Sequence, residues 1–211
     1  MQSKKFINYS IKIFWVYLIG CLAGWLIETC FVFFTTGSLE SRQSLIYGPF
    51  IQVYGIGALM FYMVLPKMKS NFIIFFIAAI LGGAVEYFYS FFQEYLFKTV
   101  SWDYTNHLLN IHGRTSLLYC LAWGILGVFF IKMVYPKLTI MDNLLDKVSF
   151  KYATTFLVLF MVFNITISGL AGYRQKERIE HISARSNIDV FLDNYYSDYV
   201  MSRIYSNKIQ K

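Results

Sequence analysis

The stretch NFIIFFIAAILGGAVEYFYSFF, residues 71–92, decides the fold class, because Glu86 is the only acidic or basic residue in it. About 20 apolar residues in a row are enough for an α-helix to cross the hydrocarbon core of a bilayer. Gly82 and Gly83 would let a second helix approach closely, and Glu86 and Ser90 follow on the same side, one turn apart. The stretch therefore predicts a membrane-spanning helix that holds a carboxylate against protein instead of lipid.

The rest of the chain has the same apolar character, which excludes an ordinary soluble domain. Hydrophobic residues make up 57% of the 211 positions and charged residues 15%, where soluble domains carry about a quarter. Five stretches reach the length of a membrane-spanning helix: 11–34, 47–65, 71–92, 116–135 and 151–172. We therefore predict an all-α polytopic membrane protein, with a bundle of about five transmembrane helices over residues 1–172.

The two longest segments outside these spans are polar. Residues 93–115 are too polar to cross a bilayer and, with Trp102 and Tyr104, too aromatic for a plain connecting loop. We expect them to form an interfacial or re-entrant segment between the third and fourth spans. The C-terminal tail, 173–211, is polar and mixed in charge. Its amphipathic part, 190–204, predicts a helix that lies on the membrane surface, or else a tail that remains unattached.

The net charge of +7 indicates a lipid bilayer as the partner, and we expect no nucleic-acid partner. Basic residues fall mainly between apolar runs and in the tail, which suits an anionic membrane surface. The distribution of Lys and Arg favours a cytoplasmic N-terminus, because the loops on the opposite side then hold only Arg42, Lys98 and Arg114. Five spans would place the tail outside the cell.

Carboxylates inside two of the spans are the first candidates for a functional site. Glu28 follows Gly20 and Gly24 at intervals of four residues, so a neighbouring helix could pack on the glycines and bury it. The alternative is that Glu28 lies near enough to the helix end to reach water. Glu86 and Glu94 share one face of the third span with hydrogen-bonding residues, which favours a working site over a solvated surface.

Two arginines are candidates for partners of an anion or of these carboxylates. Arg42 precedes YGP, residues 47–49, a helix start whose free backbone N–H groups suit an anion. Tyr47 within it could instead be an aromatic anchor at the interface. Arg114 stands just before the fourth span, where it could pair with a carboxylate of the first or third span or act as a plain anchor.

The candidate binding residues are Glu28, Arg42, Tyr47, Glu86, Glu94, Trp102, Asp103, Asn110 and Arg114. No catalytic role is assigned to any of them. The sequence predicts no metal site and no cofactor, because His107 and His112 have no third ligand nearby and the three cysteines lie inside apolar runs.

The residues singled out fall within an ordered set of short motifs. They are WLIE at 25–28, Arg42 before YGP at 47–49, YG at 54–55, EY at 86–87, Glu94, WDY at 102–104, NIHGR at 110–114 and WG at 123–124. The set resembles the ABC-transporter type IV, or CmpB-like, family of bacterial membrane permeases, and residues 191–201 are similar to that family's closing motif. The chain departs from the pattern at residues 50–52, where the family commonly has Cys-Pro, and at Ser197, where proline is frequent.

The resemblance implies a permease of the bacterial plasma membrane but no particular substrate. A transport component would need a separate ATPase subunit or a homo-oligomer, because no phosphate-binding loop is present, and residues 136–150 would form the contact surface. A second hypothesis is an intramembrane lipid-handling enzyme that uses the carboxylates as acid or base and the arginines to hold a phosphate or carboxylate. A third is a membrane scaffold or regulator whose polar residues only fasten helices together.

Overall fold

The protein is largely helical, with only short strands in the part that is described. The computed structural model describes the backbone of residues 2–40, 42–145 and 147–211, and their side chains from residue 6 onward except at 139 and 142. Its helices are α1 (Gln2–Thr36), α2 (Gln52–Val64), α3 (Asn71–Phe97), α4 (Leu117–Phe129), α5 (Val148–Ile179), α6 (Asn187–Tyr195) and α7 (Asp198–Ile204). A π-helical turn, Phe130–Val134, and a 3₁₀ helix, Tyr135–Asn143, follow α4, and a 3₁₀ turn, Leu65–Lys67, follows α2. The short strands are β1 (Thr99–Val100), β2 (Asn110–Ile111), β3 (Thr115–Ser116) and β4 (Ile209–Gln210).

Four of the described helices are long and apolar enough to cross a membrane. They are Phe6–Thr36, Asn71–Phe97, Leu117–Leu138 and Val148–Ile179. Large apolar side chains such as Phe34, Ile80 and Phe156 are more than half exposed on them, which is costly in water and favourable in lipid. The predicted all-α polytopic membrane fold is confirmed.

The expected span over 47–65 needs correction, since only Gln52–Val64 of it is α-helical. Thirteen residues make a helix about 20 Å long, shorter than the roughly 30 Å of a hydrocarbon core. The helix starts late because Gly48 has a φ of +80° and Pro49 has no N–H to donate. With four long helices in the described part instead of five, the number of spans no longer places the tail on the opposite side of the membrane from the N-terminus.

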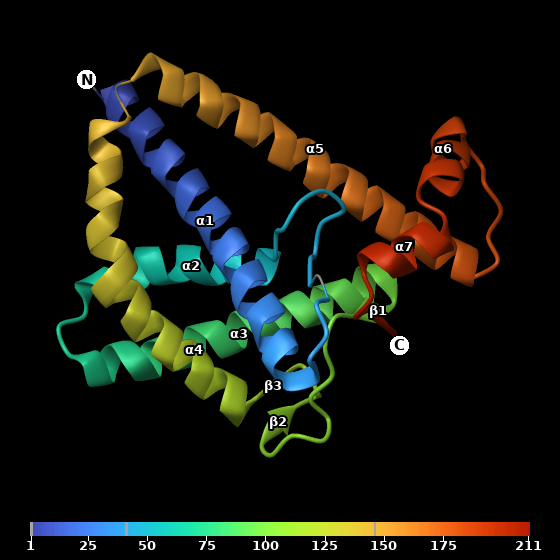
Figure 1. The fold of residues 1–211 in the computed structure, drawn as a ribbon, viewed down its shortest axis with the longest axis horizontal. Coiled ribbons are helices and arrows are strands. Elements are labelled where there is room, and N and C mark those ends of the chain that lie inside the picture. The colour runs from blue at the N-terminus through green and yellow to red at the C-terminus, as the bar shows by residue number, and fades with distance from the viewer. Residues whose placement is uncertain (1, 41, 146) are drawn as a thin grey trace.

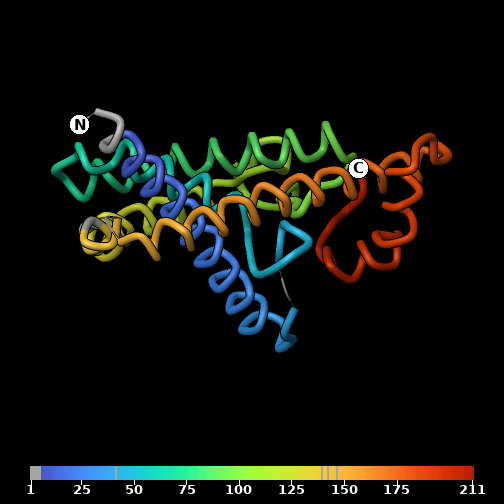
Figure 2. The backbone as a smooth tube through the Cα atoms, turned by 90° about the horizontal axis from the view of Figure 1, so that it is seen from above, coloured from blue at the N-terminus to red at the C-terminus, as the bar shows by residue number. Residues whose placement is uncertain are grey.

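The helices pack in pairs that Figure 1 shows from the front. α1 packs along α2, α3 packs along α4, and α5 runs along one edge of the molecule to α6 and α7. Seen from above in Figure 2, α1 crosses the layer of the other helices at an angle, and its C-terminal end projects from that layer.

Glycines set the distance within both pairs. A Cβ added to Gly24 on α1 would overlap the ring of Tyr54 on α2, and one added to Gly82 on α3 would overlap Trp123 on α4. The Trp123 indole can therefore lie against the backbone of α3, where it packs with Phe61 in the main apolar cluster. The close helix contacts predicted from the glycines of the first and third spans are confirmed.

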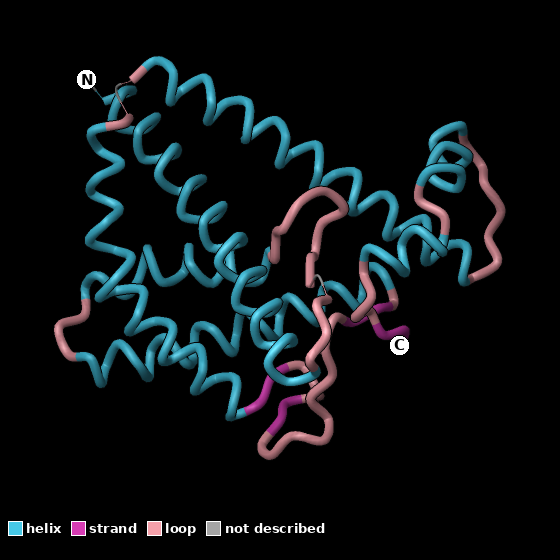
Figure 3. The backbone as a smooth tube through the Cα atoms, viewed as in Figure 1, coloured by secondary structure: helices cyan, strands magenta, loops and turns pink. Residues whose placement is uncertain are grey.

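The segment between α3 and α4 folds back onto α3, as the looped trace in Figure 3 shows. Lys98 ends α3 with a φ of +55°, and β2 and β3 then form a small hairpin with Asn110 opposite Ser116. Trp102 closes the segment, because its Nε1 donates a 2.8 Å hydrogen bond to the carbonyl oxygen of Arg114. This is a folded element and not a plain loop, and its depth in a bilayer stays a prediction.

The C-terminal tail is attached to α5 through α6 and α7, which cover most of the amphipathic stretch 190–204. The guanidinium of Arg174, only 3% exposed, donates to both carboxylate oxygens of Asp193 at 2.9 Å. Leu192 and Met201 bury themselves in an apolar cluster with Ala171 of α5. Near the end of the tail, β4 pairs with β1 in an antiparallel register, which argues against the alternative of an unattached tail. A position of the tail helices on a membrane surface stays a prediction.

Candidate functional site

A cavity of about 470 Å³ lies between the C-terminal part of α1, the loop before α2, the start of α2, residues 101–104 and α4. Three sequence-predicted residues line it, namely Glu28, Arg42 and Trp102. Tyr54 and Tyr104 line it as well, and we call it the Glu28 cavity. It is where the structure brings predicted site residues from three separate segments together.

Glu28 reaches the cavity from the projecting end of α1. Its Oε1 accepts a 2.8 Å hydrogen bond from the hydroxyl of Tyr54 on α2, and the side chain is half-buried. Tyr54 is the only hydrogen-bond donor to this carboxylate among the residues that the structure describes. The second oxygen is therefore available to a hydroxyl group or a cation of a ligand.

Arg42 reaches the same cavity from the loop before α2. Its Nε is buried without a hydrogen-bond partner, and no described carboxylate forms an ion pair with it. A half-buried guanidinium without an anion is costly, because it has lost part of its hydration and gained no Coulomb attraction in return. A carboxylate or phosphate in the cavity would supply that partner with two parallel hydrogen bonds.

Glu86 lies behind the cavity wall and is only 6% exposed. Its Oε2 accepts a 2.8 Å hydrogen bond from Thr115, and its Oε1 accepts a 3.1 Å bond from Tyr104. Tyr104 in turn stacks on Tyr119 with 4.1 Å between ring centroids, and both rings line the cavity. The phenol of Tyr104 thus lies between the buried Glu86 carboxylate and the cavity.

Tyr104 keeps its proton over the whole physiological pH range. Burial raises the pKa of the Tyr104 phenol well above its usual value, and the charges of Glu86 and Glu28 add to the rise. The phenol is therefore fixed as a hydrogen-bond donor to Glu86. The ring of Trp102 stacks on that of Tyr104, with 6.4 Å between the ring centroids.

Two predicted residues pair with each other away from the cavity. Nη2 of Arg114 lies 2.6 Å from Oε2 of Glu94, one of the three pairings that the sequence left open. The guanidinium also lies over the rings of Tyr87 and Phe91, at 5.6 and 5.5 Å from their centroids. Arg114 therefore clamps the folded-back segment onto α3 and does not line the Glu28 cavity.

The remaining three predicted residues hold backbone segments in place. Asn110 donates to the carbonyl oxygen of His107 at 2.9 Å and accepts from the N–H of Gly113 at 3.0 Å, which closes the turn before the hairpin. Asp103 pairs with Lys211 at the end of the tail. Tyr47 shares a 2.7 Å hydrogen bond with the hydroxyl of Tyr196 on the tail side of the molecule.

Comparison with protein families identifies the family of this chain. A family described as "putative ABC-transporter type IV" matches residues 15–169, which is most of the chain. The chain belongs to this family. No curated protein and no solved structure matches it. The matched region includes all nine candidate residues, whereas the tail motif at 191–201 lies beyond it, so that part of the resemblance stays a prediction.

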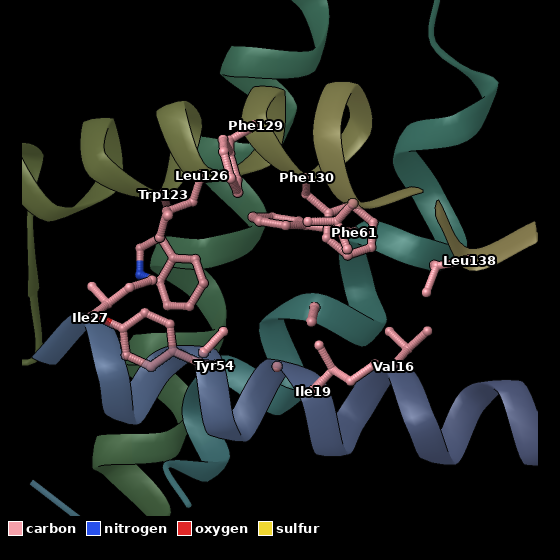
Figure 4. A pocket seen from close by; sticks show the side chains of 14 residues that line it. Val16, Ile19, Ile27, Tyr54, Phe61, Trp123, Leu126, Phe129, Phe130 and Leu138 are labelled. Atoms are coloured by element: carbon pink, nitrogen blue, oxygen red, sulfur yellow. The ribbon is translucent and has the colours of Figure 1, made fainter. Parts of the chain in front are cut away.

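An apolar pocket of about 110 Å³ adjoins the Glu28 cavity. Figure 4 shows Trp123, Phe61 and Phe130 on one side of it and α1 on the other. Ile27, Tyr54 and Leu126 line both spaces. The Glu28 cavity and the apolar pocket are therefore neighbours that share a wall.

The sequence did not reveal several residues that line the Glu28 cavity or contact Glu86 behind it. Thr115 does not line the cavity but is buried against Glu86 behind its wall. Tyr119 and Asn207 line the cavity from α4 and from the tail. Tyr54 had been noticed only as part of a motif. A usable signal existed for Thr115 alone, since a buried carboxylate requires nearby donors.

The described residues contain no group of three or more His, Cys, Asp or Glu side chains arranged to hold a metal ion. Nδ1 of His112 lies 2.9 Å from the hydroxyl of Tyr87, and the ring of His107 packs on Tyr104 and Tyr119. Both His107 and His112 thus have contacts that account for their placement.

Proposed function

We propose that this protein is the membrane-spanning, permease-like component of an ABC transporter and that the Glu28 cavity binds an amphipathic anion. The observation that carries the proposal is the placement of Arg42, which no described carboxylate pairs with, in a cavity that Glu28 also lines and that borders an apolar pocket. This combination suits a solute with an acidic group at one end and hydrocarbon at the other.

Each part of the cavity would contact one part of the solute. Arg42 would bind a carboxylate or phosphate group, for which a guanidinium offers a planar pair of donors. The free oxygen of Glu28 would accept from a hydroxyl or ammonium group on the same ligand, while Tyr54 orients the carboxylate. The pocket around Trp123 would take the hydrocarbon part.

Transport by this chain would require partners. The sequence given contains no phosphate-binding loop, so ATP hydrolysis would take place on a separate subunit. We place its contact surface at the 3₁₀ helix Tyr135–Asn143, where the Ile140 side chain is 62% exposed, on the cytoplasmic side of a bacterial plasma membrane. Four long helices are few for a solute pathway, which supports a homodimer or a second membrane subunit.

A binding measurement tests the proposal. The probe is a fluorescent long-chain carboxylate, and the matched probe is the alcohol of equal chain length, both offered to the protein in phosphatidylcholine nanodiscs. Arg42→Gln should weaken binding of the carboxylate by about 10- to 100-fold, because one charge-assisted hydrogen-bond pair is lost. Binding of the alcohol should not change. Arg203→Gln, at an exposed position of α7, is the control and should bind both probes as the wild type does.

The outcomes separate the hypotheses. Equal affinity of the wild type and Arg42→Gln for the carboxylate would show that the cavity is not an anion site. Co-purification of an ATPase subunit, lost when Ile140 is replaced by Asp, supports the transport assignment. Recovery of a chemically altered ligand would instead support the intramembrane enzyme, with Glu28 and Glu86 as its acid and base candidates.

A further inference from the structure

A second, smaller cavity of about 140 Å³ lies between the loop before α2, α3, α5 and the C-terminal segment. We call it the Lys208 cavity, after the only charged residue among those that line it. Hydroxyl and amide groups make up much of its wall, including those of Ser44, Gln52 and Ser168. No described acidic residue lines it, so Lys208 supplies the only formal charge on the wall that the structure describes.

Lys208 is held in this cavity by its neighbours in the tail. Its Nζ lies 3.6 Å from the centroid of the Tyr205 ring, and Tyr205 is itself 4% exposed. No carboxylate of the described residues pairs with Lys208, and burial lowers the pKa of its ammonium to about 8. The cavity therefore contains a cation whose only described attraction is to an aromatic ring.

The segment that carries Lys208 is fixed on both sides of it. Before it, the amide nitrogen of Asn207 donates a 3.1 Å hydrogen bond to the carbonyl oxygen of Ser101. After it, β4 pairs with β1, and the N–H of Lys211 donates to the carbonyl oxygen of Lys98 at 3.0 Å. The lysine is consequently positioned before any ligand arrives, which reduces the entropy cost of binding.

We propose that the Lys208 cavity is a binding site for a small oxyanion, a carboxylate or a phosphate group, with the Lys208 ammonium as its main contact. The hydroxyl of Ser168 and the amide NH₂ of Gln52 are available as further donors, because the bonds that they donate, to Asn164 and Tyr17, are both 3.4 Å long. Their oxygens already accept, from the N–H of Ile46 and the hydroxyl of Tyr89. A phosphate bound there would be either a free ion or the headgroup of a lipid. The site does not depend on the transport proposal.

The two cavities nevertheless adjoin each other. Ser44, Tyr89 and Ser101 line both the Glu28 cavity and the Lys208 cavity. Asn207 lines the first and Lys208 lines the second, so consecutive residues of the tail contribute to both. Occupation of the Lys208 site would therefore stabilise the tail in the position that also completes the Glu28 cavity.

The test uses the full chain in a neutral detergent, with inorganic phosphate as the probe and potassium chloride at equal ionic strength as the blank. At about five times its dissociation constant, phosphate should raise the Tm of the wild type by about 2–4 °C. Lys208→Met should weaken the phosphate affinity by about tenfold or more, and Lys208→Gln is a second variant in case methionine prevents the tail from docking. Lys176→Met, a lysine of α5 that does not line the cavity, is the matched control and should keep the full response.

A second arm distinguishes the sources of the anion. Nanodiscs of phosphatidylglycerol should raise Tm over phosphatidylcholine nanodiscs, in a manner that depends on Lys208, if a lipid headgroup occupies the site; a response to free phosphate alone assigns it to a soluble ion. Equal responses of the wild type and the Lys208 variants, or no response to either probe, overturn the proposal. Arg42→Gln should retain the Lys208-dependent response, so a failure of the transport proposal leaves this result unchanged.

Discussion

The hydroxyl of Tyr54 on α2 donates a 2.8 Å hydrogen bond to Oε1 of Glu28 on α1. The contact depends on Gly24, one turn before Glu28, because a side chain at that position would overlap the Tyr54 ring. The same helix contact therefore sets the distance between α1 and α2 and the direction of the carboxylate in the Glu28 cavity.

Gly24→Ala should lower stability and ligand affinity together. The added methyl group must displace the Tyr54 ring, and overpacking of this kind costs about 1–3 kcal/mol. A loss of 1 kcal/mol lowers Tm by about 2–4 °C in a chain of this size. Gly169→Ala on α5 is the control, because an added Cβ meets no atom within 4 Å there, and it should leave Tm unchanged or raise it. Equal changes in the two variants, measured by thermal unfolding, would contradict the packing argument.

Thr115→Val should destabilise the protein although it preserves side-chain volume. It removes the 2.8 Å hydrogen bond to a buried Glu86 carboxylate, and loss of a bond to such a group costs about 1.5–3 kcal/mol. In a Glu86→Met background the same change should cost much less, and the difference is the coupling energy of the pair. Ser116→Ala provides the control, because its buried hydroxyl has no hydrogen-bond partner and its removal should be nearly neutral. Strictly additive losses would show that Thr115 does not act through Glu86.

Arg114→Gln should affect stability slightly and anion binding not at all. The Arg114–Glu94 pair is partly exposed, with 18% and 33% of the two side chains accessible, so its loss should cost at most about 1 kcal/mol. Arg42→Gln should show the opposite pattern, with a weakened affinity for the long-chain carboxylate and little change in Tm. A loss of affinity in Arg114→Gln equal to that in Arg42→Gln would show that Arg114 also takes part in anion binding.

This contrast shows where sequence reasoning reaches its limit. Arg42 and Arg114 look alike in the sequence, since each is a lone basic residue shortly before an apolar stretch. Which of them faces a carboxylate depends on the return of residues 98–116 onto α3, and that return depends on tertiary bonds such as the one from Trp102 to the Arg114 carbonyl. Spacing along one helix carries no information about such bonds.

The long helices and their close contacts could be predicted because they follow from local rules. Apolar length predicts the long spans, and the four-residue spacing of Gly20, Gly24 and Glu28 predicts close contact with another helix, which the structure shows to be α2. Apolar length wrongly predicts a further span over 47–65. The helix there is shorter because the left-handed φ of Gly48 breaks an otherwise apolar run, and apolar length carries no information about that φ. The role of Lys208 in the second cavity was also inaccessible, since its neighbours in space are far away in the sequence.

Lowering the pH should loosen the tail through Asp103, which pairs with Lys211. The Lys211 ammonium and the N–H of Thr105 lower the pKa of Asp103 from 3.8 to about 2. Because the folded-state pKa is the lower one, the stabilisation is fully present above the unfolded value and is lost as the pH falls from about 4 to about 2. The loss should stay below about 1 kcal/mol, since the pair is partly exposed.

Thermal unfolding between these pH values should therefore show a steeper fall in Tm for the wild type than for Asp103→Asn, which has no charge to lose. Parallel curves would mean that the pair contributes nothing to docking of the tail, and Lys211→Met would then unfold like the wild type at neutral pH as well.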